Sequence, residues 1–355
     1  MKKILLHITA AAVLVSTAIQ PLHAGNEDRA GQAGANELLI NPWARTAGWG
    51  GNNIALVRGI EAISLNVAGL AMNKGTEVVF SQTDWLKGSD IKISAFGVAQ
   101  KVGESGSMAL TVSSMRFGEI ERTTVDQPDG GLGTYSPQFL TVGFSYAKEF
   151  SNSIYGGLSV KMVSESINDM KAQGLVIDAG IQYITGFNEA KDNLKFGIAL
   201  RNVGTPMKFD GEGLAYRNDN ATANINVLQQ QRAERFEMPS LVAIGASYNI
   251  DINKDHRLTP AASFTSNSFI RDQFGLAVEY GFRNMFMVRG GYTFDKKDKN
   301  AIIDDPISAQ IGLSGGLSVQ VPLGKKSDRT FGIDYGYRST KTFDGCHTIG
   351  ARFNL

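Results

Sequence analysis

Apolar and polar residues alternate with a period of two along most of the chain after its N-terminal segment. In residues 139–150, Leu140, Val142 and Phe144 share one face, and the positions between them are small or polar. Residues 272–283 follow the same rule. Because successive side chains of a β-strand point to opposite faces, we predict that each such segment is a strand with one apolar face.

Three features favour a membrane barrel over a soluble β-sandwich, in which strands alternate in the same way. The segments are about ten residues long, which is the length that a tilted strand needs to cross a bilayer. The apolar face often carries an aromatic residue near one end, as an interfacial girdle does. The other face holds Gly, Ser, Thr and charged residues, which suit a lumen. We therefore expect an all-β fold, a 14-stranded antiparallel transmembrane β-barrel, with strands near 76–85, 91–102, 107–118, 139–150, 153–164, 174–185, 193–203, 239–250, 258–268, 272–283, 285–295, 307–319, 329–338 and 345–355.

The connections between the predicted strands alternate between short and long. Outer-membrane barrels have short periplasmic turns and longer outer loops. If the last strand runs toward the periplasm, the long stretches 119–138 and 204–238 both lie outside the cell. These two loops are the surface on which we expect partners to bind.

The N-terminus has the three-part plan of a secretory signal peptide. Lys2 and Lys3 form a positive region, residues 4–19 are apolar, and Ala24 is a small residue at a cleavage position. The alternative is an anchoring helix, but the apolar run is shorter than the roughly 20 residues that span a bilayer. We expect residues 1–24 to be removed and the protein to be exported to the outer membrane of a Gram-negative cell.

Residues 25–75 do not alternate and precede the predicted barrel, which spans residues 76–355. A barrel of this size has a lumen that is either filled or conducts. We predict that this segment is a plug or hatch inside the lumen; the alternative is an unpacked periplasmic extension. Its many apolar residues favour the plug, namely Leu38, Leu39, Ile40, Trp43, Ile54, Leu56, Val57, Ile60, Ile63 and Leu65.

Composition fits a barrel and excludes several other classes of protein. The 355 residues include 40 Gly, and 19% are charged, which suits strands with one small-residue face and one apolar face. A balance of 35 basic against 34 acidic residues gives no excess for binding nucleic acid. A single cysteine excludes a disulfide framework.

The motifs that could carry chemistry are incomplete. Gly48 and Gly50 begin a dinucleotide-like pattern, but Asn53 stands at the third glycine position. Residues 251–262 resemble a calcium loop, yet they lack the glycine at position six and the glutamate at position twelve. We therefore expect no bound metal and no cofactor.

The nucleophile candidates are equally weak. After the signal peptide the chain keeps two histidines, His256 and His347. His347 adjoins Cys346, but neighbouring residues of a strand point to opposite faces, so the ring does not activate the thiol. We expect no enzymatic activity.

Two motifs in the plug segment carry a family resemblance. A glycine-rich run at 46–51 is followed by SLNVAGLA at 64–71, and both come after a lead-in at 33–45. Together they resemble the start of PorV-type proteins (the PorV/PorQ family), within the FadL-like group of fourteen-stranded barrels. Val67 stands where that family usually has proline, and valine restores a backbone N–H and frees φ. The residues of this hatch motif are Gly48, Gly50, Gly51, Asn66, Ala68, Gly69 and Leu70.

The resemblance implies a non-enzymatic component of the type IX secretion system of Bacteroidetes. Such a protein binds the C-terminal signal domain of cargo emerging from the translocon barrel and shuttles it to the sortase-like attachment machinery at the surface. Its partners would be the translocon barrel, cargo signal domains, the attachment complex and outer-membrane lipids. Apolar side chains on outer loops are a protein-binding signal, although they can also pack over the barrel mouth. The candidates are Tyr135, Phe209, Tyr216, Phe236 and Met238.

Two other functions stay open. A FadL-like channel for hydrophobic small molecules predicts an apolar pocket in the lumen, a kinked hatch and a lateral opening in a strand. A barrel with a purely structural role predicts none of these. Val67 weighs against the channel, and so do the charged residues predicted to face inward, namely Asp178, Glu279, Arg289, Asp334 and Arg352.

Overall fold

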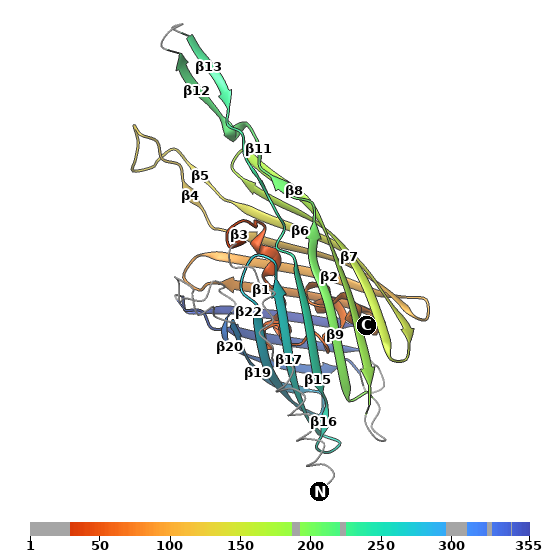
Figure 1. Ribbon diagram of the computed structural model, residues 1–355. Helices are drawn as coiled ribbons and strands as arrows, with labels where there is room; N and C mark the ends of the chain where they lie inside the picture. The colour runs from red at the N-terminus through yellow and green to blue at the C-terminus, as the bar shows by residue number, and fades with distance from the viewer. Residues whose placement is uncertain (1–28, 187–191, 221–224, 296–310, 325–328, 342) are drawn as a thin grey trace.

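Fourteen antiparallel strands close into a barrel in the computed structural model (Figure 1). The structure describes residues 29–186, 192–220, 225–295, 311–324, 329–341 and 343–355. Each wall strand pairs with its neighbours along the chain, and β22 pairs with β1 to complete the ring. The wall strands are β1(Thr76–Trp85), β2(Ile91–Val102), β3(Gly106–Arg116), β6(Gln138–Ser151), β7(Ile154–Ile167), β8(Met170–Thr185), β9(Leu194–Gly204), β15(Leu241–Tyr248), β17(His256–Asn267), β18(Gln273–Phe282), β19(Phe286–Asp295), β20(Gly312–Pro322), β21(Thr330–Arg338) and β22(Cys346–Asn354).

The expected fold class is confirmed, with small differences at the strand ends. The strand predicted at 174–185 begins four residues earlier, at Met170. The strand predicted at 307–319 runs from Gly312 to Pro322, and positions 307–310 lie outside the described residues. The predicted signal peptide at 1–24 also lies outside them.

The outward face of the wall is apolar. Phe144, Leu158 and Leu276, in the middle of their strands, are each more than half exposed. Only a hydrocarbon environment satisfies a continuous apolar band of this kind, so the protein is an outer-membrane β-barrel. None of the helices among the described residues is long and apolar enough to cross a membrane.

The two ends of the barrel differ in their connections. At the end where β1 begins and β22 stops, the turns are short; we call it the periplasmic end. At the opposite, outer end, two hairpins extend beyond the wall (Figure 1). These are β4(Ile120–Glu121) with β5(Thr134–Tyr135), and β12(Ala215–Asn220) with β13(Ile225–Gln230).

Residues 29–75 fill the lumen as a plug of short helices: η2(Asn36–Leu39), α2(Ala44–Gly48), η3(Gly59–Ser64) and η4(Val67–Met72). Helix α2 packs against β20 and β21, whereas η4 packs against β6 and β7. The plug therefore reaches separate parts of the ring. Its side chains form the core, since Trp43, Trp49, Ile60 and Leu70 are each at most 1% exposed.

Candidate functional site

Glycines let the plug approach the wall closely. A Cβ on Gly48 would lie 2.8 Å from the Cα of Gly316 in β20, so side chains are excluded at this contact. Gly50 and Gly51 adopt φ of +66° and +78° in the turn after α2, a conformation that glycine adopts at low cost. A Cβ on Gly69 would collide with the carbonyl oxygen of Val57.

Asn66 fastens the other half of the predicted hatch motif to the wall. Its side-chain amide donates hydrogen bonds to the carbonyl of Ile54 in the plug (3.2 Å) and of Ile181 in β8 (3.1 Å). Its side-chain oxygen accepts from the N–H of Ala68 (3.3 Å) and so caps η4. Ala68 and Leu70 are fully buried. The motif thus lies where plug and wall meet, and whether it opens as a hatch stays a prediction.

The charged residues predicted to face inward do so, and they are paired. The Arg289 guanidinium donates to Glu279 (2.9 Å) and to the Ser318 hydroxyl (2.7 Å). Ser318 donates in turn to Asp334, whose carboxylate lies 3.8 Å from Arg352. Such a network is stable in a buried lumen because each charge has a partner.

Asp178, the fifth of these residues, sits beside the main irregularity of the wall. It pairs with Lys161 and accepts a hydrogen bond from the backbone N–H of Asn202 (2.7 Å). Asn202 has φ of +59°, and the β8–β9 register shifts here, so Arg201 and Asn202 both point inward. Arg201 donates to the plug at Leu38 O (3.2 Å). The bulge is therefore closed by polar contacts, and the described ladders show no open lateral gap at this depth.

An apolar cavity of about 480 Å³ lies at the outer end, between the plug and the wall. Phe117 and Phe139 meet edge to face in it, with ring centroids 4.7 Å apart. Among the described residues that line it, none is charged. We call it the outer pocket; its lining includes Leu39, Ile40, Trp85, Met115, Phe117, Phe139, Asn267, Phe269 and Ile270.

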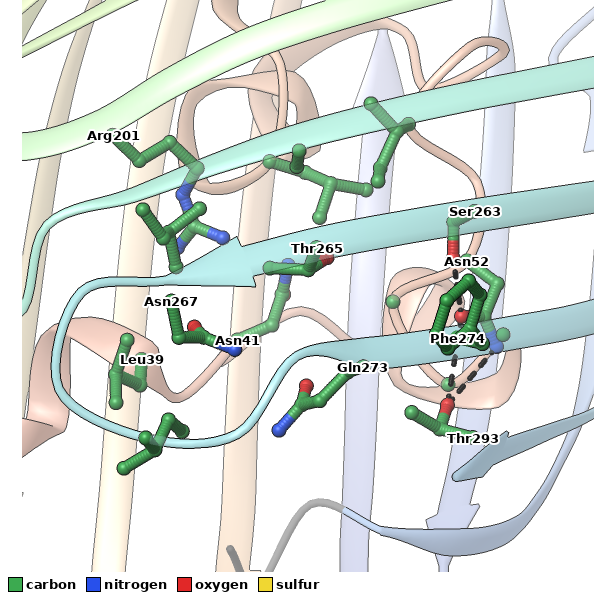
Figure 2. A pocket seen from close by; sticks show the side chains of 18 of the residues that line it. Leu39, Asn41, Asn52, Arg201, Ser263, Thr265, Asn267, Gln273, Phe274 and Thr293 are labelled. Atoms are coloured by element: carbon green, nitrogen blue, oxygen red, sulfur yellow. Dashed lines mark hydrogen bonds between the residues drawn. The ribbon is translucent and has the colours of Figure 1, made fainter. Parts of the chain in front are cut away.

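A narrower cavity continues from the outer pocket toward the centre of the barrel, and we call it the neck (Figure 2). Leu39, Asn267 and Ile270 line both spaces. The neck holds about 60 Å³, which is less than half the roughly 150 Å³ of an engineered apolar cavity that binds benzene. Asn52 closes its floor: it accepts from Ser263 (2.8 Å) and donates to Thr293 (3.2 Å), as Figure 2 shows.

A third cavity, of about 600 Å³, opens at the periplasmic end, and we call it the periplasmic vestibule. Its chemistry is cationic, because Arg45, Arg58, Lys74, Arg329 and Arg352 line it beside a single side-chain carboxylate, Glu77. Burial and the nearby Arg257 lower the pKa of the Arg58 guanidinium. The plug separates this vestibule from the outer pocket.

The five residues proposed to bind partners divide into two groups. Phe209, Phe236 and Met238 pack inward over the barrel mouth, in a cluster with Leu38 of the plug and Met207. Tyr216 stands half-exposed on the β12–β13 hairpin, and Tyr135 lies partly buried on β5. None of these positions tests the binding role, which stays a prediction.

The outer pocket was not predicted from the sequence. A partial signal was present, because Ile93, Met115 and Phe139 are large apolar residues at positions that face inward on three neighbouring strands. The bulge had a signal too: Arg201 and Asn202 are consecutive polar residues in an otherwise alternating strand.

Fold and cavities together define a plugged outer-membrane barrel with an apolar site at its outer mouth. No protein-family model and no curated protein matches the sequence. The fold is similar to that of the Ralstonia pickettii toluene transporter TbuX, at 14% identity and a TM-score of 0.54, covering 88% of this chain and 97% of that one. It is also similar to the Pseudomonas putida toluene transporter TodX (11% identity, TM-score 0.54, 88% and 97% covered) and to a Pseudomonas aeruginosa FadL homologue (12%, 0.50, 87% and 96%). The barrel thus shares the fold of FadL-type proteins.

Proposed function

We propose that the protein is an outer-membrane channel that takes up hydrophobic small molecules, the alternative to a secretion role raised by the sequence. The observation that carries this proposal is the outer pocket, an apolar cavity at the outer mouth, whereas polar and charged residues line much of the neck and of the periplasmic vestibule. Its volume of about 480 Å³ falls within the roughly 300–1,000 Å³ of small-molecule sites. The fold neighbours named as toluene transporters support the same choice.

The inward charges do not oppose this function, because they lie apart from the pocket. Asp178, Glu279 and Arg289 are each at most 8% exposed and held in ion pairs, and none of them lines the outer pocket. A hydrophobic molecule can bind at the mouth without removing water from a charge. Passage further inward requires the plug to move, because the neck is too narrow for an aromatic ring.

The test places a charge in the pocket. Ile270 lies in the short loop between β17 and β18 and lines both the outer pocket and the neck. We expect Ile270→Asp to weaken toluene binding at least tenfold, because a buried carboxylate without a partner costs several kcal/mol, of which about 1.4 kcal/mol suffices for tenfold. Calorimetry of the purified protein in detergent measures binding, and uptake of labelled toluene by Gram-negative cells lacking such channels measures transport.

A matched control makes the same change outside the pocket. Ile252→Asp alters an exposed isoleucine in a periplasmic turn and should leave both binding and uptake unchanged. If the wild-type protein neither binds toluene nor speeds its uptake, the proposed function is wrong.

A role as a type IX secretion adapter is the second candidate, and the outer hairpins favour it. Tyr216 and Leu228 are 50% and 70% exposed on the β12–β13 hairpin, which extends well beyond the wall (Figure 1). Exposed apolar side chains on such a hairpin suit protein contact. Affinity purification from the native membrane would recover a translocon barrel and cargo signal domains, and Tyr216→Ala with Leu228→Ala would abolish that recovery while leaving toluene binding intact.

A further inference from the structure

The apolar wall of the outer pocket ends at an acid. Ile93, Met115 and Phe139 pair in register across β2, β3 and β6, so their side chains form one inward-facing row. The next position in that row, on β7, is Glu165, directly opposite Phe139 and 5% exposed. A small cavity lies along this row, and Ile40, Met115 and Phe139 line both this cavity and the outer pocket.

A second acid reaches the same point from the plug. Glu37, in η2, lines that small cavity and lies close enough to Glu165 for each carboxyl to perturb the other. Both oxygens of the Glu37 carboxyl are shielded from water and accept no well-formed hydrogen bond from the described residues. Burial, and then repulsion from Glu165, raise the pKa of Glu37 to about 8.

No cation of the described chain compensates this pair. The guanidinium of Arg201 comes near, but it donates a hydrogen bond to the carbonyl of Leu38, the residue after Glu37. Lys161 is occupied by Asp178. Glu165 interacts with the Glu37 carboxyl and with the backbone N–H of Ala35, and neither of these is a cation. Two carboxyls buried together without a cation are a costly arrangement, which leucine or glutamine would avoid.

We propose that the outer pocket selects amphipathic amines, with an aromatic or aliphatic body in the apolar pocket and an ammonium group between Glu37 and Glu165. This inference rests on the proposed function, whose substrate class it narrows. An ammonium offers three donors and one positive charge, which suit two adjacent carboxyls and the two Glu37 oxygens that accept no well-formed hydrogen bond from the described residues. Side chains opposite each other on paired strands lie roughly 5 Å apart, so a ring against Phe139 places an amine two carbons away at the acids.

The test compares three probes of one shape on the full-length protein in detergent. These are 2-phenylethylamine, which is a cation at pH 7, propylbenzene, which is neutral, and phenylacetate, which is an anion. We expect calorimetry to show the amine binding about tenfold more tightly than propylbenzene, with phenylacetate weakest. This comparison needs no variant, so it does not depend on the folding of a mutant.

Glu37→Gln then tests the assignment. It should lower the ratio of amine affinity to propylbenzene affinity from about ten to about one, whereas Glu104→Gln, in an exposed periplasmic turn, should leave that ratio as in the wild type. Equal binding of amine and propylbenzene by the wild type would overturn this inference and leave the proposed function standing. An equal loss of both ligands in Glu37→Gln would also overturn it. Failure of all three probes to bind would instead contradict the proposed function.

Discussion

The two ends of the lumen differ in the side chains that line their cavities. The outer pocket is lined by apolar residues such as Trp85, Met115 and Phe139, and none of its described lining residues is charged. The periplasmic vestibule is lined by five cationic side chains. The same strands contribute to both ends. In β1, Glu77 lines the periplasmic vestibule and Trp85 lines the outer pocket. Alternation therefore decides which face a residue occupies, and depth along the strand decides what chemistry that face offers. The apolar cavity thus lies at the outer end, and the cavity at the periplasmic end is lined by charged and polar residues.

The plug keeps these two environments apart, and the buried ion pairs hold the wall around it. Gly48 contacts both β20 and the aliphatic part of Arg289, so the network that neutralises the lower lumen also forms part of the plug's seat. Three kinds of substitution test this separation of the two ends: in the buried ion-pair network, at the contact between the plug and the wall, and at the acids beside the outer pocket.

The largest effect is expected from Arg289→Met. The change leaves Glu279 buried without its main partner, and breaking a buried pair costs about 3–5 kcal/mol of unfolding free energy. Urea unfolding in detergent, followed by tryptophan fluorescence, measures it. Arg257→Met is the control: this arginine lies 3.8 Å from the same glutamate with a third of its side chain exposed, so its loss should cost less than about 1 kcal/mol. Equal losses in the two variants would show that the network does not support the lumen.

The second prediction concerns Gly336→Val, which places a larger side chain where β21 contacts helix α2 of the plug. A Cβ on Gly336 would collide with Ala44 O and lie 2.9 Å from the Cβ of Ala47, so valine pushes α2 away from β21. We expect ion conductance in planar bilayers to rise at least tenfold as the two ends connect. Gly315→Val, on the outward face with its nearest atom 3.8 Å away, should conduct like the wild type. If Gly336→Val conducts no more than the wild type, the contact between α2 and β21 is not what blocks ion flow through the lumen.

The wall could be predicted from the sequence because alternation is a local property. Leu140, Val142 and Phe144 needed no knowledge of their neighbours to be placed on one face, and β6 lies within one residue of its predicted ends. Connection lengths also predicted which end of the barrel carries the longer loops, and the structure has the β4–β5 and β12–β13 hairpins extending beyond one end; that this end faces outward stays a prediction. The plug followed from apolar residues that lacked the period of two.

The outer pocket could not be predicted in the same way, because it depends on register. Ile93, Met115 and Phe139 are far apart in sequence, and only the stagger between strands brings them into one row with Glu165. The same holds for the pairing of Glu279 with Arg289. Loop residues such as Met238 could not be assigned to surface or interior, because packing over the barrel mouth is a tertiary contact without a local signature.

The smallest effect is a pH dependence of the plug's outer half. The pKa of Glu37 is raised from 4.5 to about 8, so between these values the docked plug holds a proton that the released chain gives up. Stability then falls as pH rises through this window, and the loss is complete above about pH 8. Raising the pH from 6 to 9 should therefore lower the protection factors of the amides around η2 several-fold; these factors correct the exchange rates for the intrinsic rise of exchange with pH. The protection factors of the fully buried η4 should stay constant. Glu37→Gln should abolish this pH dependence. If the pH dependence persists in that variant, another group titrates, and Glu37 does not couple pH to the docking of the plug.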